Sequence, residues 1–269
     1  MTSNFFGKNL EKNPGSKKSQ ISAFVIIGVI IVAGVIFYFL ILGKKTPIIS
    51  QPIITEPGAY IEKCAKDAAS EAIEKMMPQG GYVTPTNFRM YNDVKIAYLC
   101  YTPLFYQKCT MQEPMYIKHL QDGITEYISP KIEDCFSELK NELEKENYQF
   151  EMRGMKIETE LGTGIARVNI EREINFGKQG ELRKIQKFGT VFNSPLYNLA
   201  ITASEIANQE AKYCNFEYVG FMLLYPEFNI DKKVIGSGES ASKIYLIKDR
   251  ESGKELNIAI RSCAFPEGF

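Results

Sequence analysis

The hydrophobic residues of this chain form one long uninterrupted run, several helical stripes and several alternating stretches. The run extends from Ile21 to Gly43, a length of 23 residues without a charged side chain. As a helix it would be about 34 Å long at about 1.5 Å per residue, enough to cross a hydrocarbon core of about 30 Å. It therefore predicts a transmembrane helix in contact with the lipid bilayer. Because it exceeds the apolar length of about 7–15 residues in a cleaved secretory signal and is followed by Lys44 and Lys45, we interpret it as an uncleaved anchor.

The lysines around this run predict its orientation. Four lysines precede it, and two follow it before the next positive charge, Lys63. The positive-inside rule then places the N-terminus in the cytoplasm and the rest of the chain outside the cell membrane. The 32 basic and 32 acidic residues balance overall, but six lysines and one acid give the first 45 residues a basic excess and leave the remainder mildly acidic. We expect a cytoplasmic basic head over 1–20, the transmembrane helix over 21–43, a Pro-containing spacer over 44–57 and an extracytoplasmic domain over 58–269.

Apolar residues at three- and four-residue steps predict three helices in this domain. The first extends over about 59–77 and is ended by Pro78. The second extends over about 113–144, where Pro130 interrupts the stripe, so that a kinked helix and two abutting helices both fit. The third extends over about 195–214 and starts with Ser-Pro, a capping Ser before a Pro at the first helical position.

Alternation of apolar and polar residues predicts strands before and after the third helix. Before it lie a strand over 94–101 and an antiparallel meander over 148–193 with one solvated face. After it come a less regular apolar segment, YVGFMLLYPEF, and a terminal hairpin over 243–247 and 256–261. No internal repeat or second domain is evident. The expected fold class is α+β, with an N-terminal transmembrane helix followed by one extracytoplasmic domain that contains an antiparallel meander and about three packed helices.

Six cysteines lie beyond the predicted anchor, an even number that is typical of disulfides in an exported domain. With no C-x-x-C pair and a single His, a structural zinc site is not expected. Fifteen pairings are formally possible, but one set is favoured by position: two cysteines flank a short segment with Pro103, two lie on the first two helical stripes, and two end the third helix and the last strand. In that order these candidates are Cys100 and Cys109, Cys64 and Cys135, and Cys214 and Cys263. The alternative is six reduced, buried thiols in a cytosolic domain.

Composition and charge exclude several functional classes. With 45% hydrophobic and 24% charged residues, the chain has the composition of a folded protein, and its balanced charge argues against nucleic-acid binding. His119 is the only imidazole. A general base is conceivable there, but no Ser or Cys partner is identifiable, and a half-exposed surface His is favoured. We expect no cofactor, no metal site and no catalytic residue.

Two pairs of carboxylates and one glycine-rich segment carry the remaining candidate chemistry. Glu158 with Glu160, and Glu171 with Glu173, are two residues apart on predicted strands, so each pair shares a face. Such pairs bind cations or share acid–base work, although a solvated sheet face is favoured. The segment Gly236–Ser240 suggests an anion loop, but it lacks the Lys and the strand–loop–helix frame of a P-loop, and we interpret it as a flexible loop.

Three features in order resemble a known group of proteins. They are the start KKSQISAFVIIG, a Cys-bearing helix that ends at Gln79-Gly80-Gly81-Tyr82, and a second helix with another Cys. They resemble uncharacterised single-pass, membrane-anchored envelope proteins of small-genome archaea. The resemblance covers much of the chain as an order of elements, and its specific parts are the anchor and the Gln79–Tyr82 turn. It implies a location in the cell envelope, without an established activity or functional residues.

The N-terminus also resembles an archaeal pilin-type signal, at Lys17-Lys18-Ser19-Gln20 before the hydrophobic run. Ser19 replaces the usual Gly, and Phe24 stands near the place of the Glu expected early in the mature helix. Our leading interpretation is a non-enzymatic cell-envelope component that binds an envelope protein, a glycan or a neighbouring subunit. The alternatives are a pilin-like filament subunit and a surface hydrolase that uses the carboxylate pairs.

Overall fold

The computed structural model describes residues 28–29, 31–32, 56–104 and 106–263. The chain divides into two compact units, Met1–Ser50 and Gln51–Phe269. Within the described residues, no helix combines the length and the apolar character needed to cross a bilayer. The predicted head, the predicted transmembrane helix over Ile21–Gly43 except for four helical residues, and most of the predicted spacer lie outside the described residues.

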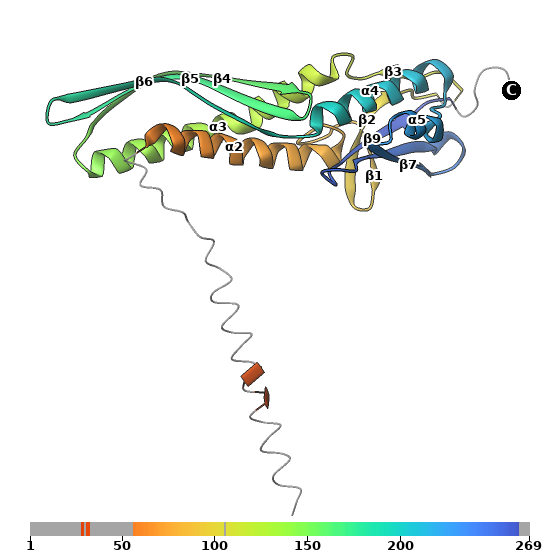
Figure 1. The fold of residues 1–269 in the computed structure, drawn as a ribbon. Coiled ribbons are helices and arrows are strands. Elements are labelled where there is room, and N and C mark those ends of the chain that lie inside the picture. The colour runs from red at the N-terminus through yellow and green to blue at the C-terminus, as the bar shows by residue number, and fades with distance from the viewer. Residues whose placement is uncertain (1–27, 30, 33–55, 105, 264–269) are drawn as a thin grey trace, which may run out of the picture. The chain divides into compact units, whose positions relative to one another are not determined.

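An antiparallel pair of long helices forms one layer of the domain (Figure 1). α2 (Pro57–Met76) begins with a Pro, which fits the first helical turn because the amide hydrogen it lacks would have no partner there. α3 (Tyr116–Lys145) is one continuous helix that contains Pro130. The two helices approach closely at Gly123 of α3, where an added Cβ would lie 2.9 Å from the methyl carbon of Met76. Gly123 is therefore required by packing rather than by backbone conformation.

A three-stranded antiparallel meander lies against this helix pair (Figure 1). Its strands are β4 (Gln149–Gly162), β5 (Ile165–Lys178) and β6 (Glu181–Asn193), with β5 in the centre. Alternate residues of β5 are buried against the helices, as the alternation predicts. At the contact, the rings of Phe136 in α3 and Phe188 in β6 meet edge to face, with centroids 5.3 Å apart.

A second, six-stranded sheet forms the other part of the domain, with the order β1-β2-β9-β8-β7 and β3 paired to β2. β2 and β9 are parallel, and the other pairs are antiparallel. The parallel pair joins a strand from the first half of the chain to the last strand. The strands are β1 (Phe88–Tyr91), β2 (Val94–Tyr101), β3 (Thr110–Met111), β7 (Phe228–Ile235), β8 (Ser242–Asp249) and β9 (Glu255–Arg261).

Two further helices pack on this mixed sheet. α4 (Leu196–Tyr213) contacts β2, β8 and β9, and the Oγ of Ser194 accepts a hydrogen bond from the amide of Leu196 at 3.3 Å. α4 is capped at its C-terminal end by Cys214, which has a left-handed backbone with φ of 56°. α5 (Tyr218–Leu224) is short and follows directly. Its first turn is capped by the carboxylate of Glu217, which accepts hydrogen bonds from the two amides of Val219 and Gly220.

The predicted α+β class is confirmed, with four corrections to its detail. α2, α3 and α4 correspond to the three predicted helices, with ends shifted by one to three residues, but α5 is a fourth helix inside the segment expected to be irregular. Pro57, assigned to the spacer, is the first residue of α2. The third helix starts at Leu196 rather than at Pro195. The predicted terminal hairpin is confirmed as β8 and β9, but it belongs to a larger mixed sheet, because β2 pairs with β9 across a separation that local alternation does not indicate.

Candidate functional site

All six cysteines form disulfides, so the predicted disulfide framework is confirmed. The pairs are those that the sequence pattern favours, and their Cα atoms are 6.7, 5.4 and 5.4 Å apart. The first pair joins α2 to α3, the second lies beside β2 and β3, and the third joins the end of α4 to the chain after β9. They are Cys64–Cys135, Cys100–Cys109 and Cys214–Cys263.

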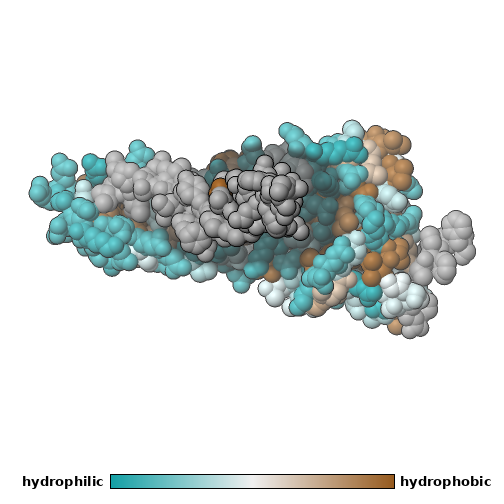
Figure 2. Space-filling model, turned by 90° about the horizontal axis from the view of Figure 1, so that it is seen from below, coloured by the Kyte–Doolittle hydropathy of each residue, from teal (hydrophilic) through white to brown (hydrophobic). Residues whose placement is uncertain are grey.

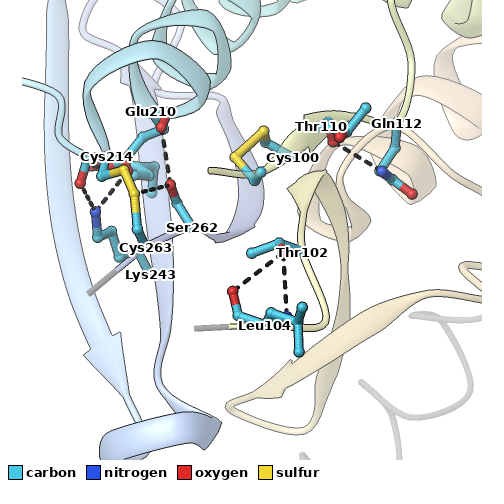
Figure 3. The surroundings of a disulfide bond; sticks show 12 residues. Cys100, Thr102, Leu104, Thr110, Gln112, Glu210, Cys214, Lys243, Ser262 and Cys263 are labelled. Carbon is cyan, nitrogen blue, oxygen red and sulfur yellow. Dashed lines mark hydrogen bonds and ion pairs between the residues drawn. A yellow bond between two sulfur atoms is a disulfide. The ribbon is translucent and has the colours of Figure 1, made fainter. Parts of the chain in front are cut away.

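A fully buried carboxylate, Glu210, lies beside the third disulfide (Figure 3). The Nζ of Lys243 is 2.6 Å from Glu210 Oε2, and the hydroxyl of Tyr245 donates to Oε1 at 2.5 Å. Lys243 also donates to the carbonyl oxygen of Cys214, and the hydroxyl of Ser262 donates to the backbone carbonyl of Glu210. A buried charge is tolerated only when it is paired and hydrogen-bonded. The network therefore ties α4 to β8 and to the chain after β9.

Electrostatics around Glu210 favour a structural role over proton transfer. Burial raises the pKa of the Tyr245 hydroxyl, and the negative charge of Glu210 raises it further, so this phenol stays a hydrogen-bond donor at neutral pH. Burial lowers the pKa of nearby Lys232, and the positive charge of Lys243 adds to that effect. The amine of Lys232 donates to Asn215 Oδ1 at 3.0 Å. The polar atoms of these groups form hydrogen bonds and ion pairs with neighbouring protein groups, which is typical of a structural network rather than a substrate site.

His119 belongs to a second polar cluster, where the turn after α2 meets the start of α3. Its Nε2 donates to the carbonyl oxygen of Gly81 at 3.1 Å, and its Nδ1 is 3.7 Å from Glu113 Oε1. The same carboxylate oxygen accepts a 2.6 Å hydrogen bond from the hydroxyl of Tyr82. The centroid of the Tyr82 ring lies 4.3 Å from that of the imidazole. Burial raises the pKa of the Tyr82 hydroxyl, and its hydrogen bond to Glu113 contributes in the same direction. The cluster fixes the turn onto α3, and the phenol already has a partner.

Tyr116 lies under this cluster. It is 2% exposed, and its hydroxyl has no hydrogen-bond partner in the structure. Burial raises the pKa of this hydroxyl. A Cβ on Gly81, whose φ is +84°, would lie 2.7 Å from the hydroxyl oxygen, so only glycine fits this turn. The close approach leaves little space for a ligand at that point.

The two predicted carboxylate pairs are divided among different cations. Glu160 pairs with Arg167 at 3.0 Å, and Glu173 pairs with Lys184 at 2.7 Å. The hydrogen bond from Lys184 is the main reason that the pKa of Glu173 is lowered to about 2. The structure instead brings Glu158 and Glu171 together, one from each pair. They line a hollow of about 200 Å³ on the outer face of the meander, which also contains Lys156 and Lys187.

A buried Arg lies on the opposite face of the meander. Arg172 is 6% exposed, and its guanidinium donates to both oxygens of Glu133 in α3 at 2.6 and 3.0 Å. It also donates to the carbonyl oxygen of Arg153 and lies over the ring of Phe136, 4.7 Å from its centroid. This forked contact fastens the meander to the helix pair.

The glycine-rich segment connects two antiparallel strands. Gly236 and Gly238 have φ values of +86° and +53°, and a short 3-10 turn, Gly238–Ser240, leads into β8. The hydroxyl of Ser240 donates to the carbonyl oxygen of Ser237 at 2.9 Å. A hairpin connection of this kind lacks the helix N-terminus that a phosphate loop uses.

An apolar surface stands out at α5. The inner side of this helix is fixed by aromatic contacts: the rings of Phe216 and Phe221 are 5.3 Å apart. Its outer side carries Val219, Leu223 and Leu224, which are 52%, 81% and 77% exposed. With Tyr225, these residues define what we call the α5 surface. It lies at the end of the domain away from the start of α2 (Figure 1), and on the face seen in Figure 2 apolar residues gather toward that same end.

No protein-family model, curated protein or solved structure matches this chain. Among the described residues, no group of three or more His, Cys, Asp and Glu side chains is arranged to hold a metal ion. Two residues that the sequence analysis missed had a signal. Glu210 falls on the buried stripe of α4, and Arg172 falls on the buried face of β5 between Ile170 and Ile174. A charge at a buried position indicates a partner, although not which one.

Proposed function

We propose that this chain is a single-pass, membrane-anchored envelope protein whose extracytoplasmic domain binds another protein through the α5 surface and performs no catalysis. The observation that carries the proposal is the exposure of Leu223 and Leu224 on a helix whose opposite side is fixed to the core. Contiguous exposed apolar side chains are costly in water and mark interaction sites. A rigid presentation lowers the entropy lost on binding.

The position of α5 within the domain and the side chains it exposes both favour a protein partner. In the ribbon, α5 lies at one end of the domain, away from the start of α2 (Figure 1). The α5 surface combines aliphatic side chains with the ring of Tyr225, which is 46% exposed. Aliphatic anchors beside an aromatic ring fit an apolar patch on a second protein better than a glycan, because sugar recognition requires several directed hydrogen bonds.

The location outside the cell is supported by the cysteines and by the sequence. Three disulfides persist in oxidising compartments, and reducing compartments keep thiols free. The uncharged run over Ile21–Gly43 and the lysines before it favour an anchor with the domain outside.

Paired substitutions at the α5 surface test the binding proposal. In cells, the full chain is expressed with Leu223→Asp and Leu224→Asp, and associated proteins are crosslinked, recovered and compared with those of the native chain. The control is Leu182→Asp in β6, a Leu that is equally exposed, at 75%. We expect a partner that is retained by the native chain and the control and is lost by the double variant. An identical set of partners for all three would contradict the proposal.

A further inference from the structure

One of the three disulfides lies in a solvent-open groove, whereas the other two are enclosed. Cys64 and Cys135 are half-buried, and they line a groove of about 340 Å³ between α2 and α3. The four remaining half-cystines are at most 5% exposed. Exchange between a thiol and a disulfide requires the attacking sulfur to reach the disulfide, so access decides which bond reacts first.

We infer that Cys64–Cys135 is a site of reversible thiol–disulfide exchange with an external dithiol, such as that of a protein disulfide oxidoreductase. A thiolate of the dithiol attacks one sulfur of the bond, and the other sulfur leaves as a thiolate. The second thiol of the dithiol then resolves the mixed disulfide. Two electrons and two protons pass to Cys64 and Cys135, which become thiols, and the dithiol becomes a disulfide.

Charges around the groove are arranged in a way that permits the approach of a thiolate. Lys63 and Lys131 line it together with Asp67 and Glu71, so the local charge is balanced. Each amine is within 2.6 Å of a carboxylate, Lys63 with Asp67 and Lys131 with Glu71. The two cations offset the repulsion that these carboxylates would exert on an incoming thiolate, and they stabilise the thiolate that leaves.

The helix pair has other contacts that keep it together while the bond is open. The hydroxyl of Tyr60 in α2 donates to Glu138 in α3 at 2.6 Å, and the hydroxyl of Tyr127 in α3 donates to Glu71 in α2 at 2.7 Å. Ile61 of α2 is fully buried in the same core as α3. The two sulfurs therefore stay close after reduction, which makes the reaction reversible.

The enclosed disulfides lack such an approach. Cys100 is fully buried in the hydrophobic core, and Cys214 is 3% exposed, with its backbone carbonyl oxygen hydrogen-bonded to Lys243 (Figure 3). Attack on either pair requires the surrounding structure to open first, which couples their reduction to unfolding.

Timed reduction tests the assignment. The full chain in detergent is treated with dithiothreitol under native conditions, quenched with an alkylating reagent and analysed by peptide mass spectrometry. We expect Cys64 and Cys135 to be alkylated at least about tenfold faster than the other four cysteines, because access controls the rate. The double variant Cys64→Ser with Cys135→Ser should lack the fast phase. Equal rates for all three pairs, or earlier reduction of an enclosed pair, would overturn the assignment.

A matched pair of charge variants tests the groove as the path of approach. Lys63→Glu places a negative charge beside the disulfide, and Lys66→Glu makes the same change on an exposed part of α2 outside the groove lining. At low salt we expect Lys63→Glu to slow reduction by dithiothreitol about threefold or more, and Lys66→Glu to slow it less. An equal effect of the two changes would contradict this approach path. After removal of the reductant, an oxidised dithiol should restore the Cys64–Cys135 bond in the native chain, and failure to restore it would contradict reversibility.

Discussion

The two sheets of this domain each bury one charged side chain, but they hold it in different ways. In the meander, Arg172 is 6% exposed, and its partner Glu133 is 45% exposed, so water still reaches the carboxylate. At the mixed sheet, Glu210 of the overlying helix α4 is fully buried, and its partner Lys243 in β8 is only 18% exposed. Two enclosed disulfides belong to the mixed-sheet part, and the disulfide in the groove belongs to the helix pair under the meander.

This difference indicates which part of the domain is rigid and which part can react with an external thiol. A charge that is buried together with its partner depends on a complete set of hydrogen bonds, and removal of one partner leaves the other uncompensated. A pair that is open to water on one side can replace a lost partner with solvent. The mixed-sheet part therefore makes a rigid base for α5, whereas the helix pair carries the bond that an external thiol can reach.

Removal of the buried carboxylate should give the largest effect. Glu210→Ala leaves Lys243 charged without its partner and Tyr245 without an acceptor, and we expect a loss of about 3–5 kcal/mol in the free energy of unfolding. The measurement is chemical denaturation of the full chain in detergent, followed by circular dichroism. The control combines Glu210→Leu with Lys243→Met, which removes both charges and should recover most of the loss. A loss below about 1 kcal/mol for Glu210→Ala would contradict the assigned importance of this pair.

Removal of the exchangeable disulfide should come next. Cys64→Ala with Cys135→Ala opens a link between residues 71 apart in sequence, and a loss of about 2–4 kcal/mol is expected from the freedom gained by the unfolded chain. The matched control, Cys100→Ala with Cys109→Ala, opens a link between residues only nine apart, and its effect on chain entropy should be smaller. Denaturation midpoints of the two variants give the comparison, and a larger loss for the short link would contradict it.

The forked contact of the meander should have a smaller effect than Glu210. Arg172→Met keeps the apolar contact with Phe136 but removes the hydrogen bonds to Glu133, and we expect a loss of about 1.5–3 kcal/mol. Arg172→Lys retains the charge without the fork and should fall between the native chain and Arg172→Met. If Arg172→Met were as costly as Glu210→Ala under the same denaturation protocol, the distinction between the two sheets would fail.

The smallest predicted effect is a pH dependence at the solvated face of the meander. The pKa of Glu173 is lowered to about 2 from 4.5, first by its hydrogen bond to Lys184. A lowered folded-state pKa contributes stability above the unfolded value, and this contribution is lost as pH falls from about 4.5 toward about 2. Glu173→Gln should flatten the stability profile in that window, and Glu171→Gln, two residues along the same strand, serves as the control. Equal profiles for Glu173→Gln and the native chain would refute the ion pair.

Much of this fold follows from local sequence patterns, and the exceptions have a common cause. The stripes of α2, α3 and α4, the alternation of β5 and the favoured cysteine pairs all depend on residues close in sequence or on position within one element. The parallel pairing of β2 with β9 depends on the assembled fold, so no local pattern indicates it. α5 was missed because both of its sides are apolar, which removes the amphipathic signal.

The clusters of side chains were harder to predict than the elements. Glu113 and Tyr82 meet His119 only because the turn after α2 returns to the first turn of α3. A spacing of two residues on one strand correctly predicts a shared face of the sheet, but it does not predict a shared site. Glu158 and Glu171 instead come together from neighbouring strands. Lateral neighbours in a sheet depend on register, which the alternation alone leaves open.

Direct analysis of the thiols in the native chain tests the central claim, a disulfide-stapled domain that faces an oxidising exterior. Cells are lysed in the presence of an alkylating reagent, and the full-length chain is recovered in detergent from membranes and analysed by mass spectrometry before and after reduction. We predict no alkylated cysteine before reduction, six after reduction, and non-reduced peptides that link Cys64 to Cys135, Cys100 to Cys109 and Cys214 to Cys263. Recovery of the chain from the soluble cytosol with all six thiols alkylated would contradict the account.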